Sequence, residues 1–221
     1  MVSTILGPIL ALLLALTPAA APSPLQQRSA TWPAWSLPAP LERPGQRDLI
    51  YPDWFLGDWQ VEASDGSNFV VRFQRDRRGR VVGDRAGNAL AVGRAVLGEQ
   101  LQAVRNDPAN PNRQLARLQL EAGVLLQLES TVVGRRRELA GDGELRVDEL
   151  ALQVLHGPGD PAVSQVETLT HFQRLSPERI AAEQWQASYP SPAAGLEVSA
   201  RSSSRLSLQL DRCPPGCDPA S

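Results

Sequence analysis

The stretch Tyr51-Pro52-Asp53-Trp54-Phe55-Leu56-Gly57-Asp58-Trp59-Gln60-Val61 marks a change in the character of the chain. Before it, the sequence is rich in Pro and Ala; beyond Gly57, apolar and polar residues alternate with the period of a β-strand. The stretch is also the densest aromatic cluster in a chain that is only 5% aromatic. We therefore expect a stiff entry segment, a turn at Gly57 and a first strand that carries Trp59.

The same alternation recurs in short segments along the rest of the chain. Its apolar positions include Phe69, Val71 and Phe73; Ala116, Leu118 and Leu120; Val166, Thr168, Thr170 and Phe172; and Leu206, Leu208 and Leu210. Turn sequences such as Asp65-Gly66-Ser67-Asn68 separate the segments. The pattern predicts an all-β chain of nine or ten antiparallel strands, in a sandwich or an up-and-down barrel.

Four segments depart from this pattern. Residues 84–98 are rich in Ala and Gly, which predicts a short helix or an irregular insertion. Residues 106–113 contain two Pro and three Asn, which predicts a loop, because Pro cannot donate to a strand ladder. The apolar phase flips near Asp148-Glu149, which predicts a β-bulge there. Arg135-Arg136-Arg137 is predicted to be a solvated hairpin tip; a contact with anionic lipid headgroups or an acidic partner is the alternative.

Composition places the chain among globular proteins of one domain. The 221 residues suffice for a sizeable core, and 42% of them are hydrophobic. The formal net charge of −2 gives no signal for nucleic acid. The 22 basic residues are all Arg, to which we attach no functional meaning.

The N-terminal region is predicted to be exported and then extended. Residues 4–16 form an apolar run too short to span a bilayer comfortably, and small residues follow at 19–21. We expect residues 1–21 to be a signal peptide, with a retained apolar segment as the alternative. Residues 22–50 read as a Pro-rich linker, in which Trp32 and Trp35 could dock on the domain, contact a partner or be ordinary linker residues.

The β-barrel domain is then expected over residues 51–212, followed by a flexible tail over 213–221. The tail holds the only two cysteines, Cys213 and Cys217, which could close a small disulfide loop. Two Cys and two His do not form a metal-ligand cluster in the sequence, and we predict neither a metal nor a cofactor.

Gly57-Asp58-Trp59 resembles the Gly-x-Trp signature of the lipocalin and calycin barrels. In those folds the Trp plugs one end of an up-and-down barrel, and an Arg near the last strand packs on it. The resemblance implies this role for Trp59, with Arg205 as the best-placed arginine and Arg201 as the second. A barrel interior that binds a ligand would be lined by Trp59, Phe69, Phe73 and Trp185.

A longer series of motifs resembles an uncharacterised family of cyanobacteria and plant chloroplasts. The matching motifs are residues 51–59, Asp84-Arg85-Ala86-Gly87-Asn88, Gly93-Arg94-Ala95, residues 107–114, Val166-Glu167-Thr168-Leu169-Thr170 and Glu183-Gln184. The resemblance implies an exported protein of the thylakoid lumen or the periplasm. It transfers no catalytic residue, because the family has no assigned function.

Five polar side chains are candidates for contacts with a ligand or a partner: Arg85, Asn88, Asn110, Asn112 and Arg113. Their donors could recognise a ligand carboxylate or another protein, or could hold the protein's own loops. Glu167 and His171 share one strand face but lie two strand steps apart, so proton exchange would need a third group.

Three functions remain open from the sequence. The first is a binding module that holds a small apolar molecule, such as a pigment, quinone or lipid, inside the barrel. The second is an auxiliary protein that contacts subunits of photosynthetic complexes through loops such as 106–113, with peripheral membrane association. The third, an enzyme on a calycin scaffold, ranks last because no catalytic constellation stands out.

Overall fold

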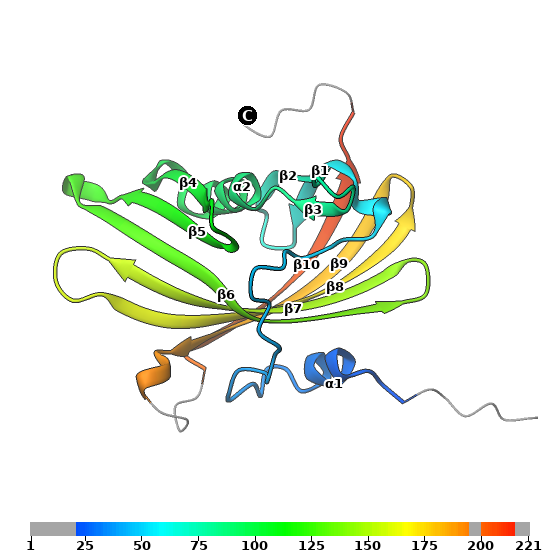
Figure 1. Cartoon of the computed structure of the whole chain (residues 1–221), viewed down its shortest axis with the longest axis horizontal. Helices are drawn as coiled ribbons and strands as arrows, with labels where there is room; N and C mark the ends of the chain where they lie inside the picture. The colour runs from blue at the N-terminus through cyan, green and yellow to red at the C-terminus, as the bar shows by residue number, and fades with distance from the viewer. Residues whose placement is uncertain (1–20, 195–199, 215–221) are drawn as a thin grey trace, which may run out of the picture.

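The computed structural model describes residues 21–194 and 200–214, in which ten antiparallel strands form one sheet curled into a half-barrel (Figure 1). The all-β prediction is confirmed. The strands are β1 (Gly57–Ala63), β2 (Asn68–Arg75), β3 (Val81–Gly83), β4 (Leu101–Asp107), β5 (Asn110–Gln119), β6 (Leu125–Ala140), β7 (Glu144–His156), β8 (Ala162–Ser176), β9 (Arg179–Pro190) and β10 (Ser202–Arg212).

The order of the strands is that of an up-and-down barrel with one open seam. The order across the sheet is β3-β2-β1-β10-β9-β8-β7-β6-β5-β4, so β1 pairs with β10 while β3 and β4 are the two edges. Trp59 lies opposite Arg212 in the β1–β10 pair, and Val61 lies opposite Leu210. The first and last strands therefore join, and the sheet opens between its third and fourth strands.

Helix α2 (Arg85–Leu97) lies across this seam and contacts both β2 and β4 (Figure 1). The helix begins at Asp84, whose side chain accepts a hydrogen bond from the Gly87 N–H, and ends at Gly98 with a φ of 57°. Of the two alternatives predicted for residues 84–98, a short helix or an irregular insertion, the structure has the helix. Packing against β4 is close, because a Cβ on Gly93 would collide with a methyl carbon of Leu101.

A second connection across the open side is made by residues 42–51, which we call the strap. Its Glu42 carbonyl accepts a hydrogen bond from the Arg135 N–H on the edge of β6, at 2.8 Å. At its other end, the Tyr51 N–H donates to the Val81 carbonyl on β3, at 2.9 Å. The strap thus links β6 on one side of the seam to β3 on the other, as a second connection in addition to α2.

Each face of the sheet has its own core. The concave face holds the larger cluster, which includes Phe55, Trp59, Val61, Phe73, Leu145, Ile180 and Leu210. On the convex face, helix α1 (Pro24–Ala30) and the chain that follows it cover Leu169, Ala187 and Tyr189. Figure 1 shows α1 and α2 on opposite sides of the sheet.

The prediction of an extended linker over residues 22–50 is wrong for the described part of that segment. Ser23 and Gln26 form a reciprocal capping box that starts α1, and Leu25 and Trp35 are almost completely buried. The Trp35 indole N–H donates to the Arg28 carbonyl, at 2.8 Å. Apolar burial on the convex face therefore orders a segment whose composition is typical of a linker.

The loop predicted over residues 106–113 is instead a tight β-hairpin. Only residues 108 and 109 form the turn, and the Asp107 carboxylate accepts a hydrogen bond from the Ala109 N–H. A register shift between Asn106 and Asp107 leaves Pro111 and Asn112 outside the regular β4 pairing. The bulge is what allows a proline within β5.

Two further predictions about β6 and β7 are wrong. Residues 135–137 lie in the middle of β6, and the hairpin tip is Gly141-Asp142-Gly143, where Gly141 has a φ of 60°. The irregularity predicted at Asp148-Glu149 lies on the partner strand, between Val132 and Gly134. The apolar phase flips along β7 because both of its faces are buried, the convex one by α1.

Candidate ligand-binding site

Trp59 is completely buried and held in place from two sides. Its indole N–H donates to the Phe55 carbonyl at 2.7 Å. The Arg212 guanidinium lies 4.4 Å from the centre of a Trp59 ring, and it also donates to the Leu56 carbonyl at 2.7 Å. A tryptophan–arginine pair of the kind expected therefore joins the first strand to the last.

The arginine of this pair is Arg212, and the assignment of Arg205 to that position is wrong. Arg205 lies on the convex face, 5.4 Å from a Trp185 ring, and forms an ion pair with Glu183. Leu206, Leu208 and Leu210 face the concave side, so two more residues along the strand bring Arg212 to the same side. Arg201 is exposed before the start of β10.

A cavity of about 250 Å³ lies between α2 and the concave faces of β1, β2, β8, β9 and β10. Most of its lining is apolar, including Phe69, Phe73, Phe172, Leu206, Leu208 and Val96. Two of the predicted lining residues, Phe69 and Phe73, are among these. Trp59 is packed in the core beside the cavity, and Trp185 belongs to the convex cluster.

The cavity reaches the surface beside α2. Val92 and Val96 both line it, yet their side chains are 41% and 70% exposed. Further in, rings fill the space: Tyr51 and Phe73 lie 4.7 Å apart, and Phe55 and Phe172 lie 5.1 Å apart, both edge to face. The interior is therefore partly filled by the protein's own side chains and partly open under α2.

Few polar side chains line the cavity, and those of Tyr51 and Gln184 form no hydrogen bond with the described residues. Both polar atoms of the Asn88 side chain are engaged: the oxygen accepts from the Arg72 N–H at 2.7 Å, and the nitrogen donates to the Arg72 carbonyl at 3.0 Å. The side-chain amide of Gln184 lines the cavity and has no hydrogen-bond partner among the described residues. Asp65 and Ser67 also line the cavity and hydrogen-bond each other.

The other predicted loop residues hold the strap and the β4–β5 hairpin. Asn112 is completely buried, donates to the carbonyls of Gly45 and Arg47, and accepts from Arg135 at 2.6 Å. Asn110 accepts from the Asn112 N–H at 3.0 Å. The side chains expected to contact a partner are thus engaged within the chain.

Two arginines from the predicted set form ion pairs inside the protein. Arg85 joins Asp48 on the strap, at 2.7 Å, to Glu149 on β7, at 3.1 Å. Although burial raises the pKa of the Glu149 carboxyl, the charges of Arg85 and Arg135 together hold it below its usual value. Arg113 pairs with Asp107 and, at 2.7 Å, with Glu129.

The convex face contains a buried polar cluster that the sequence did not predict. Arg28 of α1 donates to both oxygens of the Glu167 carboxylate at 2.8 Å, and the Tyr189 hydroxyl donates to the same carboxylate at 2.9 Å. Asp148 lies beside it, fully buried, and neither of its oxygens has a hydrogen-bond partner among the described residues. Burial and then the charge of Glu167 raise the pKa of Asp148 to about 8.

This cluster is closed to solvent by α1, so we assign it no catalytic role. His171 lies 3.4 Å from Glu144, away from Glu167. Within residues 21–194 and 200–214, no three His, Cys, Asp or Glu side chains are grouped so that they could hold a metal ion. In the same part of the chain, no helix combines the length and apolar character needed to cross a membrane.

The predicted tail and leader lie largely outside the described residues. Cys213 is disulfide-bonded, and its N–H donates to the Asp58 carbonyl at 2.9 Å. Its predicted partner, Cys217, lies outside the described part of the chain, as does the predicted signal peptide up to residue 20.

Comparison with known proteins gives one match. A family described as "Domain of unknown function (DUF6816)" matches residues 63–210, which run from the last residue of β1 to Leu210 in β10. No curated protein and no solved structure matches the chain significantly.

Proposed function

The chain belongs to the family described as Domain of unknown function (DUF6816), and we propose that its half-barrel binds a small apolar molecule under α2. The observation that carries this proposal is the apolar cavity that opens to solvent past the exposed valines Val92 and Val96. Ligand sites are typically concave and mostly apolar, with a few polar groups that orient the ligand. The cavity has this character.

The size of the cavity restricts the ligand. At about 250 Å³ it is slightly smaller than the pockets of roughly 300–1,000 Å³ that enclose drug-sized molecules. An aliphatic chain or a single ring fits within it, and the rest of the molecule would emerge along α2. Chain-bearing molecules such as a lipid, a quinone or a pigment with an isoprenoid tail meet this requirement.

Gln184 supplies a polar contact for such a ligand. Its unpaired side-chain amide lies among Leu206, Leu208 and Phe172 in the lining. A ligand with a carbonyl or ester oxygen would accept a hydrogen bond from this amide. We therefore expect an oxygen-bearing apolar ligand rather than a pure hydrocarbon.

We further propose an exported location, in the thylakoid lumen or the periplasm. The apolar run over residues 4–16 and the small residues at 19–21 support it. A protein in such an aqueous compartment that shields an apolar chain from water would serve as its carrier or store.

The first test is to purify the protein from its source and identify bound molecules by absorbance and mass spectrometry. The second uses a fluorescent fatty acid as a probe and compares Val96→Asp with Leu97→Asp. Val96 lines the cavity, whereas Leu97 is its exposed neighbour on the same helix and does not. Val96→Asp should weaken probe binding roughly tenfold, since the added charge must be desolvated. Equal affinity in the two variants, or no probe binding by the wild type, would refute the cavity as the site.

A further inference from the structure

A groove rich in arginine lies along the edge of β6, apart from the apolar cavity. It has a volume of about 480 Å³ and lies between the strap, the start of β3 and residues 135–138. Six arginines line it: Arg43, Arg47, Arg80, Arg135, Arg136 and Arg137. Only three acidic residues line the groove, although the whole chain has a net charge of −2. The groove is therefore a local concentration of positive charge.

Half of these arginines already have a carboxylate partner. Arg80 pairs with Asp76, Arg135 with Glu149, and Arg136 with Glu138. These ion pairs compensate the charge of three arginines. The uncompensated positive charge of the groove therefore comes from the other three.

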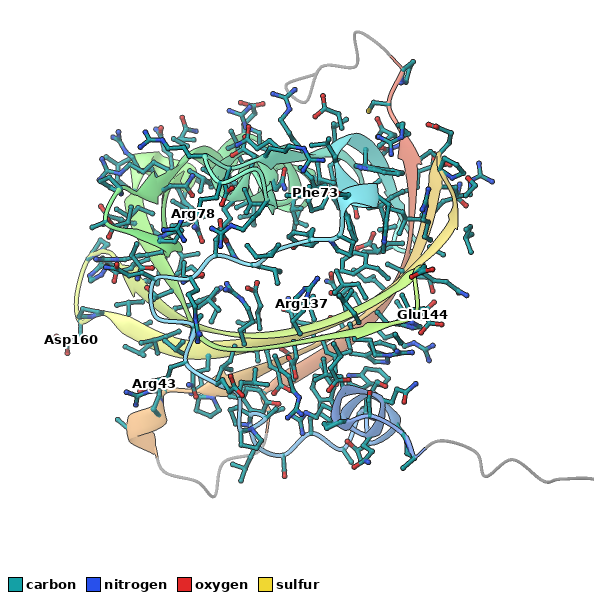
Figure 2. The ribbon with its side chains drawn as sticks, turned by 45° about the vertical axis from the view of Figure 1, so that its right-hand side comes forward. Arg43, Phe73, Arg78, Arg137, Glu144 and Asp160 are labelled. Atoms are coloured by element: carbon teal, nitrogen blue, oxygen red, sulfur yellow. The ribbon has the colours of Figure 1, made fainter. Side chains whose placement is uncertain are left out.

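The remaining arginines have donors to spare. Arg43 and Arg137 form no hydrogen bond or ion pair with side chains or carbonyls of the described residues, and Arg47 uses only Nε, on the Pro44 carbonyl at 3.3 Å. Among the acidic residues of the lining, Asp48 forms an ion pair with Arg85. Glu42 is therefore the acidic residue of the lining that has no arginine partner among the described residues. Figure 2 shows Arg43 on the far side of the sheet from Arg137, so Arg47 and Arg137 are the two unpaired arginines left to share one ligand.

Arg137 occupies the least compensated position. Figure 2 shows it rising from the concave side of the sheet, and burial lowers the pKa of its guanidinium. An arginine nevertheless stays protonated in proteins, so the charge remains. A partly desolvated charge without a partner is costly, and an anion in the groove would offset that cost.

The backbone of β6 adds a donor at the same place. Pairing between β5 and β6 stops at Arg113 and Thr131, so the later part of β6 has an open edge. The Arg135 N–H points to that edge, because it donates to Glu42. In an antiparallel ladder every second N–H points the same way, so the Arg137 N–H faces the groove as well.

We propose that this groove binds a phosphate or sulfate group through Arg47 and Arg137. Guanidinium forks match the oxygens of such anions and form strong charge-assisted hydrogen bonds with them. The anion could be free in solution or could be the headgroup of a lipid. The site shares no lining residue with the apolar cavity, so it stands whether or not that cavity binds a ligand.

The test measures binding of inorganic phosphate to the full chain by calorimetry, at constant ionic strength with chloride as the replaced anion. Wild type is compared with Arg137→Gln and Arg47→Gln. Arg174→Gln is the charge-matched control, since Arg174 is exposed on β8 and has no side-chain partner among the described residues. Each substitution in the groove should weaken binding roughly tenfold, while the control keeps the wild-type affinity.

A parallel measurement separates the two sources of the anion. The same four proteins are sedimented with vesicles of phosphatidylcholine, alone or mixed with phosphatidylglycerol. Saturable phosphate binding that depends on Arg137 supports a free anion, and binding to the mixed vesicles alone, with the same dependence, supports a headgroup. The proposal is overturned if neither phosphate nor the mixed vesicles bind, or if Arg137→Gln and Arg174→Gln behave alike in both measurements.

Discussion

At the scale of single residues, Trp59 and Arg212 show how two positions far apart in the chain close the half-barrel. The Arg212 guanidinium forms a cation–π contact with the Trp59 ring and donates a hydrogen bond to the Leu56 carbonyl. One side chain therefore contacts both the buried ring and the backbone just before β1. Arg205 and Trp185 form a similar pair on the exposed convex side. The two pairs have the same chemistry but differ in burial.

This difference predicts unequal effects of two alanine substitutions. Arg212→Ala should lower the free energy of unfolding by about 2–3 kcal/mol, through the lost cation–π contact and the unsatisfied Leu56 carbonyl. Arg205→Ala should cost less than about 1 kcal/mol, as expected for an exposed ion pair. Urea denaturation of both variants provides the measurement, and equal losses would show that the buried pair has no special part in closing the sheet.

Asp148 makes the stability of the protein depend on pH. Because its pKa is raised to about 8 from the ordinary value of 3.8, the folded protein holds a proton that the unfolded chain releases between these two values. The folded state therefore binds more protons in this window, and the free energy of unfolding should fall as pH rises from about 4 to about 8.

Asp148→Asn should remove this slope and make the protein more stable than the wild type at pH 8. The amide carries no charge to repel Glu167 and can donate a hydrogen bond to it. Thermal melts across the pH range test this, with Asp160→Asn, in the exposed β7–β8 turn, as the control for removing one carboxylate. A wild-type slope that persists in Asp148→Asn would assign the pH dependence to another group.

At the scale of elements, the side chain of Asn88 attaches α2 to the backbone of β2. Asn88 hydrogen-bonds both the N–H and the carbonyl of Arg72, as a neighbouring strand would. The helix has exposed apolar residues of its own, including Val92, Val96 and Leu97. The position of α2, and with it the roof of the apolar cavity, therefore depends on this amide.

Asn88→Ala should loosen α2 without unfolding the sheet. The Arg72 N–H would lose the Asn88 oxygen as its acceptor, at a cost of about 1–3 kcal/mol, while the Arg72 carbonyl would keep its hydrogen bond from the Asp84 N–H. Hydrogen exchange followed by mass spectrometry should show faster exchange in residues 85–97 while β7 and β8 keep their protection. Asn106→Ala, whose side chain meets Gln114 at an exposed site, is the control. Unchanged exchange over α2 would show that packing alone holds the helix.

At the scale of the whole molecule, the sheet is an open half-barrel, and three other segments of the chain pack over it. Helix α2 and the strap bridge the open seam, and the segment from α1 to Trp35 covers the convex face. The convex cover is a condition for burying Glu167 and Asp148, since Arg28 comes from it. The N-terminal segment is thus part of the folded unit.

Removal of residues 1–40 should therefore destabilise the protein. Leu25 and Trp35 are nearly fully buried, and burial of two such side chains stabilises by about 3–5 kcal/mol in total. Urea unfolding and binding of a fluorescent hydrophobic probe should show lower stability and an exposed apolar surface around Tyr189. A chain that lacks only residues 1–20 keeps α1 and Trp35 and serves as the control. If both shortened chains unfold at the same urea concentration, the convex cover is not part of the cooperative unit.

Periodicity was sufficient to predict the strands and the inward face that carries Phe69 and Phe73, whereas composition left residues 84–98 open between a helix and an irregular insertion. The strands and their inward face depend on residues close together in the chain, whose alternation is visible in the sequence. Arg212 could also have been found, because it continues the inward phase of Leu206, Leu208 and Leu210. The resemblance of Gly57-Asp58-Trp59 to the Gly-x-Trp signature led to the prediction of Arg205 instead.

The open seam, the strap and the convex core depend on contacts between residues more than 60 positions apart, such as Asn112 with Gly45 and Arg28 with Glu167. No local pattern specifies which strand edge a Pro-rich segment will join, because its backbone and side chains find their partners only once the sheet has formed. For the same reason, three arginines that resembled a solvated turn in the sequence lie in a groove. Local alternation thus sets which residues face inward, whereas long-range packing sets which surfaces are covered and which remain open to a ligand.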